Sequence, residues 1–186
     1  MINRPLNTKK ALIRHLKYAS YKDDQDGAVW DMVWDKFISR SPTDNEIMNL
    51  LESTVHEHKK INKSRLIYSI ACMETNVDTF SFFLEILQND KINNDLRLDF
   101  EEAVMILHLT KNMSTRLIEI LENEKLSLIV KQSIANIFTD LETYEPIDIS
   151  RLKVLAENKD LNFKLTYTLK NALKYIKVEG IKEWNP

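Results

Sequence analysis

The group His56, Glu57 and His58 has the residue types of a metal site. Residues two apart on a helix point about 200° apart, whereas the helical zinc site of metalloproteases places its two histidines at i and i+4. The two imidazoles cannot share one ion on a helix. The group therefore indicates a solvated helix face. His108, which lies between Leu107 and Leu109, is expected to be a partly buried, hydrogen-bonded histidine.

An acidic turn that contains Asp23, Asp24, Asp26 and Gly27 has the residue types of a calcium loop. With the glycine at the sixth position of such a loop, Lys22 falls at the first position and Val33 at the twelfth. An EF-hand needs an acidic ligand at the first position and a bidentate glutamate at the twelfth. The segment therefore indicates a polar turn and an N-terminal cap for the helix that follows.

Nucleophilic catalysis has no local signature in this chain. No serine stands in a G-x-S-x-G turn, and Cys72, which is the only cysteine, has no histidine near it in the sequence. The chain holds two Gly and four Pro, so it lacks the glycine-rich loops that cradle phosphates. These observations predict a protein that is not an enzyme and that uses no cofactor, metal or small-molecule substrate.

Composition and hydropathy limit the class of protein. Hydrophobic residues make up 44% and charged residues 29% of the 186 residues, as in a globular protein. No stretch reaches the roughly 20 apolar residues that cross a bilayer, and the first residues lack the apolar core of a signal peptide. A lone cysteine suits a reducing compartment. We therefore expect a cytoplasmic protein that makes no membrane contact.

Helices must position most of the side chains considered above, because apolar residues recur at three- and four-residue steps almost throughout. The first four expected helices span residues 8–20, 28–39, 44–60 and 63–74. Thr43 and Glu46 form a capping-box pair at the start of the third. Strict alternation over the length of a strand occurs nowhere, so the sequence predicts an all-α fold with no β-sheet.

From residue 78 onward the sequence reads as one unit written three times. Its first helices are FSFFLEILQND, STRLIEILENEK and SRLKVLAENKD, and its second helices are NDLRLDFEEAVMILHL, LSLIVKQSIANIFTDL and LNFKLTYTLKNALKYI. At a fixed interval of 34 residues the first helices align Leu87 with Leu121 and Leu155, and Leu84 with Ile118 and Leu152. Small residues within the second helices, Ala103, Ala135 and Ala172, allow close helix packing. Residues 46–75, which carry Ala71, read as a looser fourth copy.

These paired helices resemble HEAT and armadillo repeats in period and in organisation over residues 43–177. The resemblance implies a short right-handed α-solenoid of about five helix pairs in a single domain that spans residues 1–186. Residues 1–40 would form a divergent N-terminal cap pair, and residues 178–186 a C-terminal tail. The repeats are shorter than the 40 or so residues usual for that class, and its signature residues are absent. Tetratricopeptide packing remains a second option, although its signature residues are missing too.

Charge is distributed unevenly along the chain. Residues 61–145 carry eight Lys or Arg against fourteen Asp or Glu, whereas residues 146–186 carry eight against five. On one expected helix, Asp95, Asp99 and Glu102 share a face opposite the apolar stripe of residues 96, 100, 103 and 107. An ordinary solvated surface explains such carboxylates, and an acidic surface that docks on a basic protein is the alternative. The predicted partner-binding residues are Asp95, Asp99, Glu102, Asp140, Glu142 and Tyr144.

Trp30 and Trp34 lie one turn apart on the second expected helix. Most aromatic stripes of this kind belong to a core. If the two indoles were exposed, they would be candidate interface anchors, because tryptophan is enriched in the buried centres of interfaces. The sequence leaves open whether they are core or interface residues.

Three functions from different classes are compatible with these patterns. The chain resembles the bacterial immunity proteins, including those of contact-dependent growth inhibition, that neutralise a secreted toxin. That resemblance implies an inhibitor whose acidic face covers the active-site groove of a basic nuclease toxin domain. The alternative is a HEAT-like scaffold or adaptor that binds a protein or peptide. Direct nucleic-acid binding, supported only by Lys164, Lys170, Lys174 and Lys177, is disfavoured by the pI of about 6.1.

Overall fold

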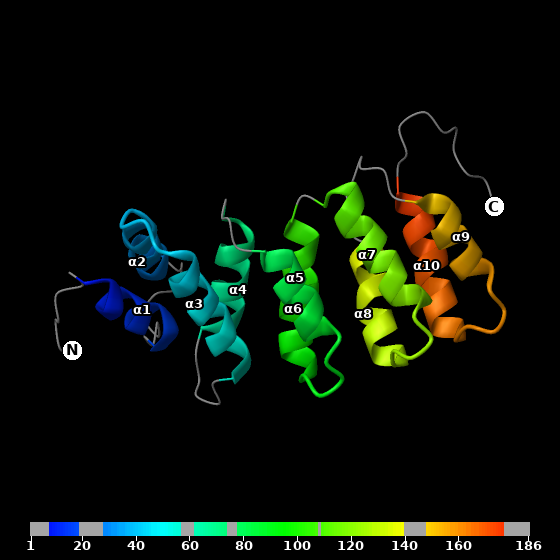
Figure 1. Ribbon diagram of the computed structural model, residues 1–186, viewed down its shortest axis with the longest axis horizontal. Coiled ribbons are helices and arrows are strands. Elements are labelled where there is room, and N and C mark those ends of the chain that lie inside the picture. The colour runs from blue at the N-terminus through cyan, green and yellow to red at the C-terminus, as the bar shows by residue number, and fades with distance from the viewer. Residues whose placement is uncertain are drawn as a thin grey trace. The chain divides into compact units, whose positions relative to one another are not determined.

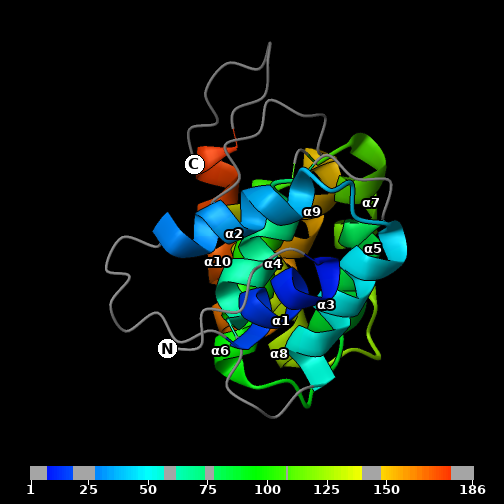
Figure 2. The same cartoon turned by 90° about the vertical axis from the view of Figure 1, so that its left-hand side faces the viewer.

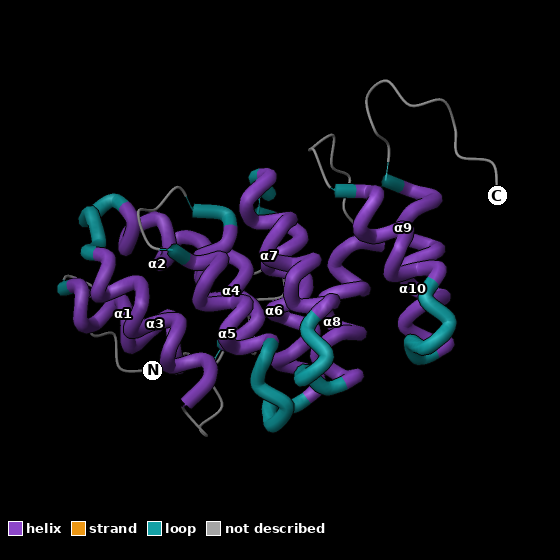
Figure 3. The backbone as a smooth tube through the Cα atoms, turned by 45° about the vertical axis from the view of Figure 1, so that its right-hand side comes forward, coloured by secondary structure: helices purple, strands orange, loops and turns teal. Residues whose placement is uncertain are grey.

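The computed structural model describes residues 8–18, 28–56, 62–73, 78–107, 109–139 and 148–176. In these residues the secondary structure consists of ten α-helices without a β-strand (Figures 1 and 3). The prediction of an all-α fold is therefore confirmed for the described part of the chain. The helices are α1 (Lys9–Tyr18), α2 (Ala28–Ile38), α3 (Asp44–His56), α4 (Lys63–Ala71), α5 (Thr79–Leu87), α6 (Asn94–Ile106), α7 (Lys111–Glu122), α8 (Leu128–Thr139), α9 (Ile149–Glu157) and α10 (Phe163–Tyr175).

The chain divides into two compact units, residues 1–78 and residues 79–186. The first unit contains α1 to α4, drawn in blue to teal in Figure 2. In it α1 packs on α2 and α4, and α3 packs on α4. The backbone carbonyl of Leu16 joins three of its segments, because it accepts hydrogen bonds from the indole Nε1 of Trp30 at 3.2 Å and from the side chain of Asn62 at 2.8 Å. Trp30 is 1% exposed and so belongs to the core of this unit.

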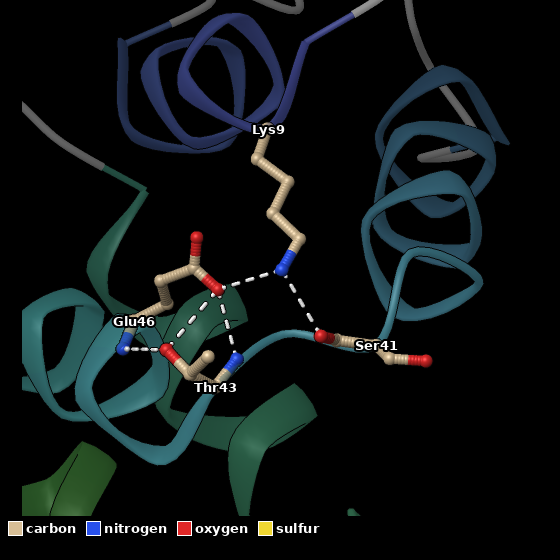
Figure 4. Close-up of polar contacts among 4 residues, drawn as sticks. All are labelled: Lys9, Ser41, Thr43 and Glu46. Carbon is tan, nitrogen blue, oxygen red and sulfur yellow. Dashed lines mark hydrogen bonds and ion pairs between the residues drawn. The ribbon is translucent and has the colours of Figure 1, made fainter.

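The predicted capping box at the start of α3 is present (Figure 4). The backbone N–H of Thr43 donates to the Glu46 carboxylate at 2.8 Å, and the backbone N–H of Glu46 donates to the Thr43 hydroxyl at 3.3 Å. Lys9 of α1 donates to the same carboxylate and to the carbonyl of Ser41, both at 3.0 Å. Ser41 has a φ of 49°, a left-handed conformation that costs a non-glycine residue about 1 kcal/mol or more. The lysine thus ties α1 to the turn from which α3 begins.

The described residues of the second unit form three helix pairs, α5–α6, α7–α8 and α9–α10, and the members of each pair are in contact. The second helices also pack in series, α6 on α8 and α8 on α10, and among the first helices α7 packs on α9. Figures 1 and 3 show α6, α8 and α10 as a row in chain order. The arrangement is compatible with a helical-repeat fold.

The turn inside each pair is built three times from the same hydrogen bonds. The side-chain oxygens of Asn89, Asn123 and Asn158 accept from the backbone N–H two residues later at 3.0, 3.1 and 2.9 Å. Their backbone carbonyls accept from the N–H three residues later at 3.3, 3.2 and 3.4 Å. Asparagine suits this position because its short amide can bond its own backbone in a turn. The three turns are therefore equivalent in their hydrogen bonds.

This turn places the third copy one residue out of step with the fixed 34-residue alignment. Asn89 and Asn123 are separated by 34 residues, whereas Asn123 and Asn158 are separated by 35. Measured from the turn, Ala156 takes the place of Leu87 and Leu121, and Leu155 takes that of Ile86 and Ile120. The exposed fractions agree, since Leu155 and Ile120 are both 8% exposed and Ile86 is 9% exposed. The apolar pattern does not reveal this shift, because Leu155 and Ala156 are both buried and either of them fits the column of Leu87 and Leu121.

The small residues of the second helices do not all occupy the same position along the helix. Counted from the cap residues Asn93, Ser127 and Asn162, the column of Ala103 and Ala172 holds Ile137 rather than Ala135. All four side chains are buried.

In the described residues, none of the helices combines the length and the hydropathy needed to cross a membrane.

Candidate functional site

The helices α6, α8 and α10 begin in the same way, and this fixes how their side chains are oriented. The side-chain oxygens of Asn93, Ser127 and Asn162 accept hydrogen bonds from backbone N–H groups of the first turn at 2.8, 3.3 and 2.9 Å. Three, seven, ten and eleven residues after these caps every side chain is buried. In α6 and α10 the side chains one, two and five residues after the cap are exposed. Because the helices also pack in series, their outward sides form one surface, which we call the second-helix face.

Large apolar side chains are exposed on this face. They include an aromatic pair at the start of α10, whose rings stack with centroids 6.3 Å apart and an interplanar angle of 27°. The apolar members and their exposed fractions are Leu98 (54%), Leu128 (44%), Ile129 (55%), Phe163 (81%) and Tyr167 (58%). Exposed apolar side chains clustered within a polar rim mark sites of protein interaction.

Two of the predicted partner-binding carboxylates lie on the second-helix face. Asp95 and Glu102 of α6 are exposed, and Asp99 between them is half-buried. The apolar stripe expected opposite them is also in place, because Leu96, Phe100 and Ala103 are buried and Leu107 is half-buried. Asp140, Glu142 and Tyr144, the remaining predicted members, lie outside the described residues.

The site residues predicted from the sequence do not include the apolar members of this face. A usable signal exists in α10, where Phe163 and Tyr167 are separated by one turn and lie off the buried stripe of Leu165, Leu169 and Ala172.

A network of hydrogen bonds, here called the polar ladder, joins the three helices beneath this face. The side chain of Asn136 donates to the Glu101 carboxylate at 3.1 Å. The side-chain amide of Gln132 donates to Asn136 at 3.0 Å and to the Thr168 hydroxyl at 2.8 Å. Hydrogen bonds of amide and carboxylate groups are directional, so the polar ladder fixes how α6, α8 and α10 are aligned with one another.

Arg97 anchors the α6 end of the polar ladder. The residue is 5% exposed, and its guanidinium donates to the carbonyls of Leu87 and Asn89, each at 2.8 Å, and to the Ser133 hydroxyl at 3.4 Å. Burial lowers the pKa of Arg97 below its ordinary value, although the neighbouring Glu101 and Asp90 oppose this shift. The cation caps the last carbonyl of α5, that of Leu87, and binds the carbonyl of Asn89 in the turn between α5 and α6.

The remaining chemical candidates do not form a site in the described residues. Cys72 is exposed at the end of α4, and His56 is exposed at the end of α3. Glu57, His58, His108 and the acidic turn at residues 23–27 lie outside the described residues. Within the described ranges no three His, Cys, Asp or Glu side chains are grouped so that they could hold a metal ion.

The two tryptophans are also placed. Trp30 is in the core, and Trp34 is half-buried and stacks on it with ring centroids 5.5 Å apart. Trp30 is therefore not an exposed interface anchor, which leaves the second-helix face as the strongest candidate for function. Comparison of the chain with protein-family models, with curated proteins and with solved structures gave no match.

Proposed function

We propose that this chain is a HEAT-like helical-repeat protein that binds another protein through the second-helix face. The observation that carries the proposal is the exposure of five large apolar side chains on three helices that pack on their pair partners and on one another. Phe163 and Tyr167 already stack on each other in the free protein. Rigid aromatic side chains bind at a low cost in conformational entropy, which makes them good anchors for a partner.

The threefold turn and the row of second helices support the HEAT-like part of the proposal. In such a fold, each helix pair leaves an apolar stripe that the next pair covers, and the second helices line one surface of the stack. The right-handed solenoid of about five pairs expected from the sequence extends this arrangement to the whole chain.

A basic nuclease toxin domain is the partner that we propose for this surface. Nucleases bind phosphates and carry basic grooves, and the carboxylates of Asp95 and Glu102 are the complement of such a groove. The chain would then act as a cytoplasmic immunity protein that covers the groove and excludes the nucleic acid.

An adaptor that holds a segment of another kind of protein is the second candidate. Lys164, Lys170 and Lys174 are exposed on α10 and would repel a partner that is basic throughout. This observation favours a partner with a mixed surface.

Site-specific photo-crosslinking in the protein's own cells tests the proposal. The photoreactive amino acid p-benzoylphenylalanine replaces Leu98 or Tyr167 on the second-helix face. Matched controls place it at Glu119 of α7 or at Val154 of α9, which are also exposed. We expect one discrete protein adduct from the two face positions and none from the controls. Adducts from the controls alone, or from no position, would contradict the proposal.

The identity of the adduct separates the two candidates. An immunity function requires a nuclease, and co-expression of this chain must then restore growth to cells that express that nuclease. An adaptor function requires a protein without toxicity.

A further inference from the structure

Charge changes sign across the second-helix face. The exposed or half-buried charges of α6 are all carboxylates, those of Asp95, Asp99 and Glu102, because Arg97 and Glu101 are buried. The only charged residue of α8 is Lys131, which is 7% exposed. Helix α10 has no acidic residue between Phe163 and Tyr175, and its lysines are exposed. The face is therefore acidic at α6, uncharged at α8 and basic at α10.

The two charged ends are too far apart to neutralise each other. Packed helix axes are separated by about 8–10 Å, which places α6 and α10 roughly 16–20 Å apart. At physiological salt the Debye length is about 8 Å, so each end acts on a ligand independently. Between the ends lie the exposed apolar side chains of Leu128 and Ile129.

The uncharged middle favours a helix over an extended peptide as the occupant. An extended segment carries backbone N–H and C=O groups that need partners, and a helix satisfies these groups internally. Leu128 and Ile129 offer no hydrogen bonds from their side chains. The side-chain N–H groups of Gln132 and Asn136 beside them already donate within the polar ladder.

We propose that the second-helix face binds an amphipathic helix of its partner whose charge reverses along its length. Its basic end lies over the carboxylates of α6, its apolar side chains lie on α8, and its acidic end lies over the lysines of α10. At a rise of 1.5 Å per residue, a span of 16–20 Å corresponds to about 11–13 residues, or three turns. This inference rests on the proposed function and adds the chemistry of the segment that is bound.

Selection from a displayed library tests the inference. Each library peptide is a 14-residue helix with a fixed Leu/Ile seam and with either sign of charge allowed at both ends. Purified full-length protein is the bait in three forms: wild type, Asp95→Lys with Glu102→Lys, and Lys164→Glu with Lys170→Glu. All four substituted side chains are exposed, so the fold is expected to persist, and circular dichroism checks it.

The wild type is expected to enrich peptides with opposite charges at the two ends. The bait with lysines on α6 is expected to enrich peptides that are acidic at both ends, and the bait with glutamates on α10 peptides that are basic at both ends. Each charge reversal is expected to lower the affinity for the best wild-type peptide at least tenfold, as measured by fluorescence anisotropy. The loss of affinity is expected to be smaller in 0.5 M salt. A control bait with Glu85→Lys and Glu119→Lys on α5 and α7 is expected to enrich the same peptides as wild type.

The outcomes separate this inference from the function on which it rests. If the three baits enrich the same charge pattern, and Phe163→Ser nevertheless abolishes binding, the charge-reversing helix is wrong and the binding face stands. If no bait enriches a peptide, the charge-reversing helix is wrong and the binding face stands or falls with the crosslinking result. If the enriched peptides bind Phe163→Ser and Ile129→Ser as tightly as wild type, the proposed function fails as well.

Discussion

The buried guanidinium of Arg97 is the clearest case in which one residue decides local structure. It donates to the carbonyl of Leu87 at the end of α5 and to that of Asn89 in the following turn, and it lies near the buried carboxylate of Glu101. Hydrogen bonds that involve a charged group are each worth about 1.5–3 kcal/mol, and a buried group that loses its partner adds the cost of desolvation.

Arg97→Met is therefore expected to lower the free energy of unfolding by about 2–4 kcal/mol. Urea denaturation at pH 7 measures the change. Lys91→Met removes an exposed cation from the same turn and is expected to alter stability by less than about 0.5 kcal/mol. Equal effects from the two substitutions would show that the guanidinium does not cap α5.

Glu46 provides a prediction about pH. Its folded-state pKa lies below the ordinary value of 4.5, first because the backbone N–H of Thr43 donates to it and then because Lys9 does. A lowered pKa stabilises the fold at pH values above the unfolded-state pKa, and this contribution is lost as the pH falls through the folded-state pKa. Glu46→Gln keeps the capping geometry but removes the charge.

The substitution Glu46→Gln is expected to cost about 0.5–1 kcal/mol at pH 7, the usual range for a partly exposed ion pair and cap. The difference in unfolding free energy between wild type and variant should shrink below pH 4.5. It should vanish once Glu46 is protonated in both the folded and the unfolded state. Urea titrations at pH 7, 5 and 3 measure it. A difference that stays constant over this range would mean that the carboxylate charge does not contribute.

At the scale of elements, the three turns that begin at Asn89, Asn123 and Asn158 are the test of repeat equivalence. Each asparagine side chain accepts the same hydrogen bond, which alanine removes, so the substitution should cost nearly the same at each site, about 1 kcal/mol. Aspartate can form the same turn and should restore most of the stability. Asn112→Ala, at an exposed position on α7, serves as the control.

Thermal and urea unfolding of the three variants give the comparison. If Asn158→Ala is neutral while the other two variants are destabilised, the pair α9–α10 is not equivalent to the first two pairs.

The helices and the capping box could be predicted because both depend on local chemistry. Apolar spacing determines which residues a helix buries, and a threonine followed three residues later by glutamate satisfies the N–H groups at its start. The register of the third repeat could not be predicted. A single additional residue before Asn158 leaves both Leu155 and Ala156 buried, so the apolar pattern fits either alignment.

The candidate site could be predicted only in part for a related reason. The sequence showed that Asp95 and Glu102 lie opposite a buried stripe, because that relation is contained within one helix. The sequence could not show that Phe163 and Ile129 lie on the same surface as these carboxylates, because this depends on how separate helices pack.

At the scale of the whole molecule, the formal net charge of −2 conceals a separation of charge. The sequence shows an acidic middle and a basic C-terminal part. The structure places carboxylates and lysines from these parts on the first and last helices of one row. A partner that meets both ends is oriented by them, so its association rate should fall as salt is added.

The central claim is that the second-helix face carries the interface, and the affinity for the protein captured by crosslinking tests it most directly. Isothermal titration calorimetry compares wild type with Ile129→Ser, Phe163→Ser and Val154→Ser. Val154 is the matched control, because it is 70% exposed and apolar but lies on the first helix α9. We expect the first two substitutions to weaken binding about 30-fold or more, as loss of an interface anchor does, and Val154→Ser to change it less than about twofold. Equal affinities for all four proteins, or a loss confined to Val154→Ser, would contradict this account.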